Sequence, residues 1–288
     1  MHKPLRSRPL LRRAGAALGT CALAFAWCAQ AGATTLTVPA KYRQHGRLVF
    51  ATDATYAPME FVAKDGHTIV GADVDLGRAI AHRLGLKADF VNASFDSIIP
   101  ALQAGKYDVS MSAVSITKKR EQVVDFVSYF SAGTSFYVGA HSKVAVQDLA
   151  DLCGLSVAVE KGTTQADDAT RQSGQCTASG KKPVSVLVFP DQNGANLAIA
   201  SGRAQVGMAD SPVAAWIVKQ SHGQFKLAGK AYDAASYGVA MPKNSGLAQP
   251  VLAALKQVIA SGEYAKILHK WGITSGGISN PAINDATQ

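Results

Sequence analysis

Residues 115–126, SITKKREQVVDF, place three basic residues directly after a strand-like end built from small and hydroxylated residues. A run of charged residues is most often a solvated face. Arg120, however, has a planar guanidinium that makes paired hydrogen bonds to a carboxylate, which the ammonium groups of Lys118 and Lys119 cannot do. The surroundings of Arg120 therefore decide whether it faces water or a ligand.

Other patterns that would indicate catalysis or metal binding are missing from the sequence. There is no Gly-x-Ser-x-Gly elbow and no Walker loop. The histidines beyond the first 33 residues are scattered, without metal-ligand spacing, and are expected at the surface: His45, His67, His82, His141, His222 and His269. The sequence therefore predicts neither a metal site nor a cofactor.

Residues 1–33 have the pattern of a secretory signal peptide, with a basic start, a short apolar run and small residues before the mature chain. The apolar run is shorter than the roughly 20 residues that a membrane span needs. We expect cleavage near Ala31 or Ala33 and an exported, periplasmic product. A lipid anchor at Cys21 or Cys28 remains an alternative.

The mature chain is expected to be weakly basic and to carry one disulfide. The full chain has 29 basic and 20 acidic residues. Five of the basic residues lie in the leader, so 24 basic residues remain against 20 acidic ones, which gives no case for nucleic-acid binding. About 255 residues are enough for one large or two small domains. Cys153 and Cys176 are the remaining cysteines, and an even pair in an exported chain indicates a structural disulfide.

Strand-like and helix-like segments alternate along the mature chain, which is typical of an α/β protein with a mainly parallel sheet. The sequence predicts a strand that ends at Asp53, a hairpin that turns at Asp65 and Gly66, and a helix with Asp73 as N-cap and Gly85 as its stop. The same rhythm returns in the second half. In such folds ligands gather at the carboxyl ends of strands.

Four segments, in this order and with these spacings, closely resemble the periplasmic solute-binding proteins of polar amino-acid ABC importers (bacterial extracellular solute-binding protein family 3): LVFATDATYAPMEF, GADVDLGRAIAHRLG, FDSIIPALQAGKYDVSMSAVSITKKR and SGEYAKILHKWG. The resemblance covers residues 46 to 272 approximately. It implies the type II periplasmic-binding-protein fold, with two α/β lobes joined by two crossover strands, TSFYVGA and SYGVAM. Lobe one would be residues 40–134 plus 237–275, lobe two residues 135–236, and residues 276–288 a flexible tail.

The resemblance also implies a site in the cleft that reads both charges of an amino acid. Arg120 would grip the α-carboxylate, and the lysines beside it would face solvent. Thr163 and Thr164 would offer backbone N–H groups at a helix N-terminus to the same carboxylate, and Asp210 would bind the α-ammonium. Further head-group contacts would come from Ser112, Ala113 and Ser115.

The residues expected to face the ligand's side chain are predicted from the family resemblance and from their charges. Tyr56 and Phe95 align with the aromatic pair that sandwiches the ligand side chain in the family. Asp53 and Glu160, with Glu60 as a further candidate, would make a negative pocket suited to arginine, lysine, ornithine or histidine. Glutamine or another polar amino acid is the alternative ligand.

The sequence therefore predicts a non-catalytic, monomeric protein that captures an L-amino acid and delivers it to the membrane permease of an ABC importer. An exported dehydratase on the same fold is a second hypothesis, but it would typically need altered head-group residues, whereas Arg120 and Asp210 are both present. A sensory role, with presentation of the ligand to a receptor, is a third.

Overall fold

The computed structural model describes residues 37–286. Contacts divide the chain into two units, Met1–Thr35 and Leu36–Gln288, and everything below concerns the second unit by itself. The predicted signal peptide, its cleavage site and the leader cysteines lie outside the described residues.

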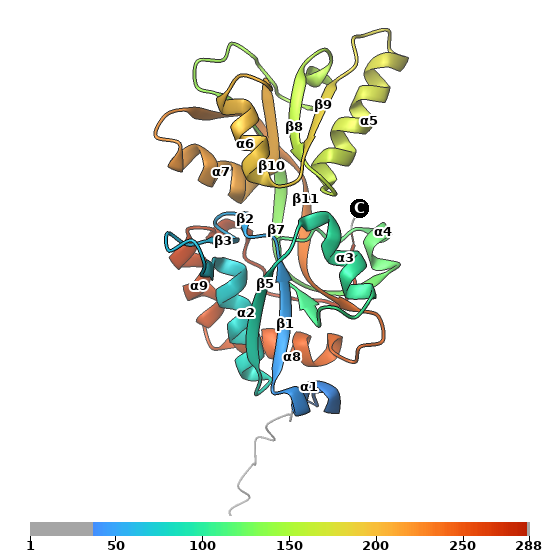
Figure 1. The fold of residues 1–288 in the computed structure, drawn as a ribbon, viewed down its shortest axis with the longest axis vertical. Coiled ribbons are helices and arrows are strands. Elements are labelled where there is room, and N and C mark those ends of the chain that lie inside the picture. The colour runs from blue at the N-terminus through green and yellow to red at the C-terminus, as the bar shows by residue number, and fades with distance from the viewer. Residues whose placement is uncertain (1–36, 287–288) are drawn as a thin grey trace, which may run out of the picture. The chain divides into compact units, whose positions relative to one another are not determined.

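One mixed sheet runs through this unit and carries both lobes (Figure 1). Its strands lie in the order β5 (Lys87–Asn92), β1 (Arg47–Thr52), β6 (Val109–Ser110), β11 (Phe225–Pro242), β7 (Val124–Gly139), β10 (Val206–Asp210), β8 (Ser156–Glu160) and β9 (Ser185–Phe189). The strands pair in parallel at both ends of this order, and the long strands β7 and β11 pair antiparallel in the middle. The fold is thus the predicted two-lobed α/β architecture.

Strands β7 and β11 are longer than the predicted crossovers, with 16 and 18 residues. Each belongs to both lobes, so the predicted segments TSFYVGA and SYGVAM are only parts of them. Their pairing shifts register between Ala228 and Ala235, at the level where the chain passes from one lobe to the other. Two continuous strands with a local irregularity form a natural hinge.

Lobe one surrounds the β5-β1-β6 end of the sheet (Figure 1). Its helices are α1 (Ala40–His45), α2 (Ala72–Arg83), α3 (Phe95–Gln103), α4 (Lys118–Glu121), α8 (Ala248–Ala260) and α9 (Glu263–Trp271), and a small sheet consists of β2 (Thr55–Tyr56), β3 (Glu60–Val62) and β4 (Ile69–Val70). In the core Phe50 stacks on Phe90 with ring centroids 4.7 Å apart. A Cβ at Gly77 would lie 2.7 Å from Phe90, so this glycine allows α2 to approach the sheet closely.

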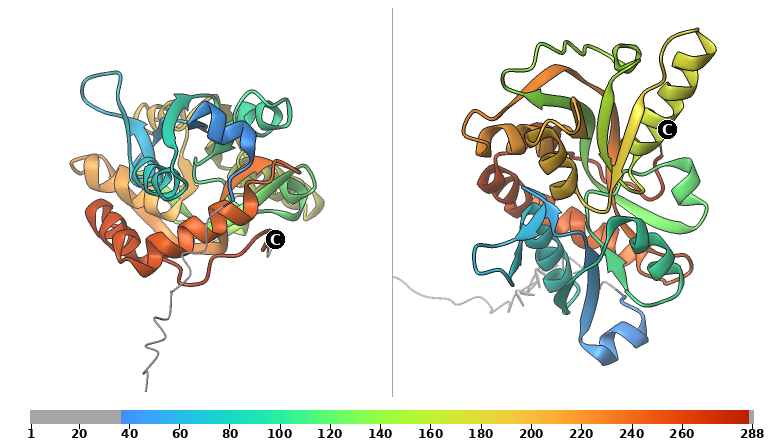
Figure 2. Two further views of the ribbon diagram at one scale, coloured as in Figure 1. Left: turned by 90° about the horizontal axis from the view of Figure 1, so that it is seen from below. Right: turned by 45° about the horizontal axis from the view of Figure 1, so that its top comes forward.

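Lobe two surrounds the β10-β8-β9 end, and the tilted view shows α5 and α7 on opposite flanks of it (Figure 2). Its helical segments are η1 (Leu149–Leu152), α5 (Thr164–Ala178), α6 (Gln192–Ala200) and α7 (Ser211–Gln220). The predicted disulfide is confirmed: Cys153, after η1, is bonded to Cys176 in α5. The bridge joins the C-terminal part of α5 to the residue that follows η1.

Two local features differ from the expectations. Helix α2 is capped by Gly71 rather than by Asp73, because the Asp73 carboxylate accepts hydrogen bonds from Ala113 and Tyr129 instead. The C-terminal segment, expected to be a flexible tail, lies along β7 after a short helical turn, η2 (Thr274–Gly276). Ser128 N donates to Ala282 O at 2.9 Å, and Ala286 N donates to Glu121 Oε1 at 2.8 Å. This segment covers an edge of β7 that β10 does not reach.

Candidate functional site

All eleven residues predicted from the sequence line one cavity between the lobes. The list is Asp53, Tyr56, Phe95, Ser112, Ala113, Ser115 and Arg120 from lobe one, and Glu160, Thr163, Thr164 and Asp210 from lobe two. Glu60 and Gln165 line it as well. The cavity measures only about 10 Å³, which is room for one water-sized sphere. An amino acid can therefore enter only when the lobes part.

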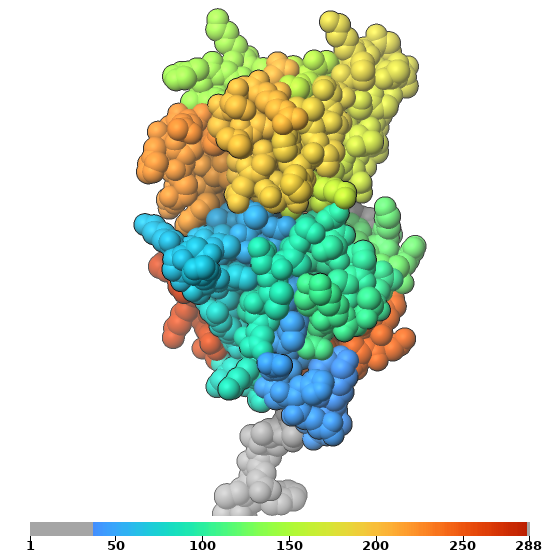
Figure 3. All heavy atoms as spheres, in the orientation of Figure 1, coloured from blue at the N-terminus to red at the C-terminus, as the bar shows by residue number. Residues whose placement is uncertain are grey.

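The topology explains why these residues meet. Parallel strands present their carboxyl ends at one edge of a sheet. Asp53 directly follows β1, Glu160 is the last residue of β8, and Asp210 is the last residue of β10. The strand ends of the two lobes point at one another across the cleft, and the space-filling view shows lobe two resting on lobe one there (Figure 3).

Arg120 bridges the lobes. Its backbone is held in the short helix α4, where Thr117 Oγ1 accepts from Arg120 N at 3.2 Å. Its guanidinium donates to Ser115 O at 2.8 Å in lobe one and to Gly162 O at 2.9 Å in lobe two. The Cζ atom lies 5.5 Å from the centre of the Phe95 ring. Lys118 and Lys119 are exposed, as predicted.

The turn of lobe two that receives Arg120 is held tightly against lobe one. Lys161 Nζ lies 2.8 Å from Asp96 Oδ2 across the cleft. Gly162 has φ +81°, and a Cβ there would lie 2.9 Å from the Cβ of Asp96. A larger residue at position 162 would therefore be strained and would also keep the lobes apart.

Asp210 turns its carboxylate toward the cleft rather than capping α7, with which it makes no side-chain cap bond. Gln165 Nε2 donates to Asp210 Oδ1 at 2.8 Å and to Thr134 Oγ1 at 2.8 Å. Burial raises the pKa of Asp210 to about 6, although hydrogen bonds and Arg120 oppose that shift. Sequence reasoning missed Gln165, whose only signal was its place in the first turn of the predicted helix.

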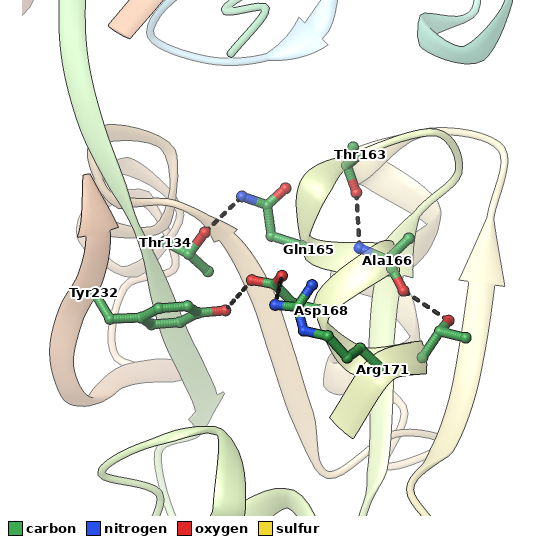
Figure 4. A network of polar contacts seen from close by, with 8 residues as sticks. Thr134, Thr163, Gln165, Ala166, Asp168, Arg171 and Tyr232 are labelled. Carbon is green, nitrogen blue, oxygen red and sulfur yellow. Dashed lines mark hydrogen bonds and ion pairs between the residues drawn. The ribbon is translucent and has the colours of Figure 1, made fainter. Parts of the chain in front are cut away.

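A polar network places the N-terminus of α5 at the cleft. Thr163 caps the helix by accepting from Ala166 N at 3.2 Å. Farther along α5, Asp168 accepts from Tyr232 of β11 at 2.8 Å and from Arg171 at 2.6 Å. Figure 4 shows Gln165 and Asp168 pointing from α5 toward Thr134 and Tyr232 of the crossover strands. The start of α5 therefore lies at the cavity, which Thr163, Thr164 and Gln165 line, and free backbone N–H groups at a helix N-terminus can bind an anion.

Part of the cavity lining is acidic. Asp53 Oδ1 accepts from Thr55 Oγ1 at 2.7 Å, and Oδ2 accepts from Phe95 N at 3.0 Å. Glu160 is 2% exposed, and its carboxyl group lies close to that of Asp53. Burial, and then the charges of Asp53, Asp191 and Asp210, raise the pKa of Glu160 to about 9. This part of the cavity therefore favours a positive charge or a bound proton.

Among residues 37–286, no cluster of His, Cys, Asp and Glu has the geometry to hold a metal ion. In that same part of the chain, no helix is long and apolar enough to cross a membrane.

Comparison with known proteins gives a family match and several similar proteins and solved structures. The model of the bacterial extracellular solute-binding proteins, family 3, matches residues 48–274. The arginine-binding protein ArgT of Corynebacterium glutamicum is 34% identical over 249 residues, which cover 86% of this chain and 81% of that protein. An ancestral arginine-binding protein solved with arginine gives a TM-score of 0.72 at 36% identity, covering 78% of this chain and 98% of that one. The structure of an ancestral arginine-binding protein with glutamine gives 0.71 at 36% identity, covering 79% and 98%.

Proposed function

The chain belongs to the bacterial extracellular solute-binding proteins, family 3, and from this premise we propose that it captures a cationic L-amino acid and delivers it to an ABC importer. The observation that carries the proposal is the meeting of Arg120 and Asp210, from opposite lobes, in one cavity. A guanidinium pairs with an α-carboxylate, and a buried carboxylate pairs with an α-ammonium. The two together select a zwitterion.

The preference for a cationic side chain follows from the charges around the rest of the cavity. Asp53 and Glu160 line it without a cationic partner of their own among the hydrogen bonds and ion pairs of the described residues. Removing such carboxylates from water is costly unless a positive charge compensates. Tyr56 and Phe95 offer aromatic faces that suit both an alkyl stem and a cation. Arginine, the ligand named for two of the relatives, has all of these features.

Several further assignments belong to the same proposal. The protein would work in the periplasm as a monomer and without catalysis, and a permease would receive its ligand. Lobe one would comprise residues 40–134 plus 237–275 and lobe two residues 135–236. Support comes from β7 and β11, whose irregular pairing lies near these boundaries.

Glutamine is the second candidate ligand, because an ancestral arginine-binding protein was also solved with glutamine. A glutamine amide would leave the Asp53–Glu160 pair protonated, as the raised pKa of Glu160 allows. The two candidates therefore differ in what happens at the Asp53–Glu160 pair. A cationic side chain would bring its own positive charge to the pair, whereas a glutamine side chain would leave the proton on it.

Titration calorimetry of the mature protein with L-arginine, L-lysine, L-glutamine and L-glutamate tests the proposal. We expect the cationic ligands to bind most tightly and glutamate most weakly. In the matched variant Glu160→Gln the advantage of arginine over glutamine should shrink. Tightest binding of glutamate, or no binding of any amino acid, would overturn the proposed function.

A further inference from the structure

Two carboxyl groups lie against one another at the cavity, which Glu60 lines. Glu60, at the start of β3, and Asp73, in the first turn of α2, are both fully buried at 0% exposure. Their carboxyl groups are close enough for a hydrogen bond between them. Two carboxylates have only acceptor oxygens, so this contact requires a proton on one of them.

The remaining hydrogen bonds show where that proton lies. Glu60 Oε1 accepts from Ser112 Oγ at 2.9 Å. Asp73 Oδ2 accepts from Tyr129 OH at 2.6 Å and from Ala113 N at 2.9 Å. The oxygens left over, Glu60 Oε2 and Asp73 Oδ1, have no donor from the protein. One proton between these two atoms satisfies both.

The surroundings oppose a second negative charge on the pair. Around Glu60 the charged groups are Asp73 and Asp53, both acidic. The titratable hydroxyls that interact with the pair are those of Tyr56 at Glu60, Tyr264 at Asp73, and Tyr129 at both. Burial, followed by the charge of Asp73, raises the pKa of Glu60 well above its usual value. Asp73 already accepts two hydrogen bonds and is the better-stabilised carboxylate.

The pair supports the backbone that faces the ligand site. Ser112 Oγ accepts from Asp53 N at 2.8 Å while it donates to Glu60, so it joins the acidic wall to the pair. Ala113 has φ +46°, a left-handed conformation that is unfavourable for a residue with a side chain. The hydrogen bond from Ala113 N to Asp73 helps to hold that conformation.

We propose that Glu60 and Asp73 share one proton and act as positioning residues, with neutral Glu60 donating to Asp73, so that the pair fixes Ser112 and Ala113 for the ligand's head group. The positioning role rests on the proposed amino-acid binding, whereas the shared proton does not. Glu60 then contributes no negative charge to the cavity, and Asp73 carries the single charge of the pair.

The matched variants are Glu60→Gln and Glu60→Ala. A glutamine amide can donate to Asp73 Oδ1 while its carbonyl accepts from Ser112, which imitates the neutral acid. We expect Glu60→Gln to bind L-arginine within about threefold of the parent at pH 7, with an unchanged ratio of arginine to glutamine affinity. Glu60→Ala should lose more than tenfold, since a buried donor and acceptor then lack partners. Binding by Glu60→Gln as weak as that of Glu60→Ala would overturn the positioning role.

The shared proton is tested without any ligand. Between pH 5 and 8 the folded parent keeps a proton that its unfolded chain has released, and Glu60→Gln has no such proton. The ratio of the parent's unfolding constant to that of Glu60→Gln should therefore rise by up to about tenfold per pH unit over this range. If the unfolding constants of the two proteins change in parallel with pH, the proposal of a shared proton is overturned. This outcome does not depend on which ligand the parent protein binds.

Discussion

The backbone N–H of Asp210 donates a 3.1 Å hydrogen bond to the hydroxyl oxygen of Tyr56. This bond joins the end of β10 in lobe two to β2 in lobe one, and both residues are buried. It also connects Asp210, whose carboxylate is proposed to bind the ligand's α-ammonium group, to Tyr56, whose ring is proposed to contact the ligand's side chain. Closure of the lobes and assembly of the site are therefore the same event.

Tyr56→Phe should weaken ligand binding because it removes this bond and leaves a buried N–H without its partner. Such a loss costs about 1–3 kcal/mol, or roughly 5- to 150-fold in affinity. The matched control is Tyr264→Phe, whose hydroxyl donates to Tyr129 O at 2.7 Å and accepts from Ile278 N of the C-terminal segment at 2.9 Å, so that it makes no bond to lobe two. Calorimetry with L-arginine should show lost affinity for the first variant and parental affinity for the second. If the two variants bind L-arginine with equal affinity, the Tyr56 hydroxyl does not contribute to closure of the lobes.

Glu160→Gln should stabilise the ligand-free protein at neutral pH. The pKa of Glu160 rises from its usual value near 4.5 to about 9, so the folded protein keeps a proton that the unfolded chain loses above pH 4.5. The resulting loss of folding stability in the parent protein is absent below pH 4.5 and grows as the pH rises toward 9. We expect a gain of about 1–3 kcal/mol in the free energy of unfolding at pH 7, vanishing near pH 4.5. Denaturant titrations at several pH values check this, and a destabilised variant at pH 7 would contradict it.

Binding of a cationic ligand should release the proton of Glu160, because the ligand's charge replaces it beside Asp53. The affinity for L-arginine should then increase from pH 6 to pH 8, by up to about tenfold per pH unit. The affinity for L-glutamine should change little over this range. Calorimetry in buffers of different ionisation enthalpy measures the released proton directly. Arginine binding without proton release would show that Glu160 does not face the ligand's charge.

The Cys153–Cys176 bridge should support stability but not recognition. It closes a sequence separation of 23 residues within lobe two, which corresponds to about 3 kcal/mol in the chain-entropy model. We expect the double variant Cys153→Ala and Cys176→Ala to lose about that amount of unfolding free energy. Its affinity for L-arginine should stay within about twofold, because the network of α5 with β7 and β11 still places the helix N-terminus.

The sequence predicted which residues line the cavity better than it predicted the contacts between them. Asp53, Glu160 and Asp210 could be placed because each follows or ends a strand, and the resemblance put those strand ends on one cleft. Gln165 could not be found in this way, because its partners Thr134 and Asp210 are 31 and 45 residues away. Such contacts depend on how the strands of lobe two pair, which no local pattern encodes.

Asp73 shows why a correct local rule can still give the wrong role. An acidic residue at the start of an apolar helix pattern is a good N-cap by sequence. Its side chain instead bonds Ala113 and Tyr129, which lie 40 and 56 residues away. Buried partners on other elements override the cap preference, and only the folded arrangement reveals them. The continuous strands β7 and β11 were similarly read as short crossovers, because the sequence does not show where a strand passes between lobes.

The most direct test of the account compares Arg120→Ala with Lys119→Ala by titration calorimetry. L-arginine and its α-amide, which lacks the carboxylate charge, serve as ligands. Truncating one member of a desolvated charge pair costs about 2–5 kcal/mol, so Arg120→Ala should bind L-arginine roughly 30-fold to several thousand-fold more weakly. Lys119→Ala, which removes an exposed charge, should change binding by less than about 1 kcal/mol. The α-amide should bind the parent poorly and lose little more in Arg120→Ala. Parental binding of L-arginine by folded Arg120→Ala would contradict the placement of the ligand site.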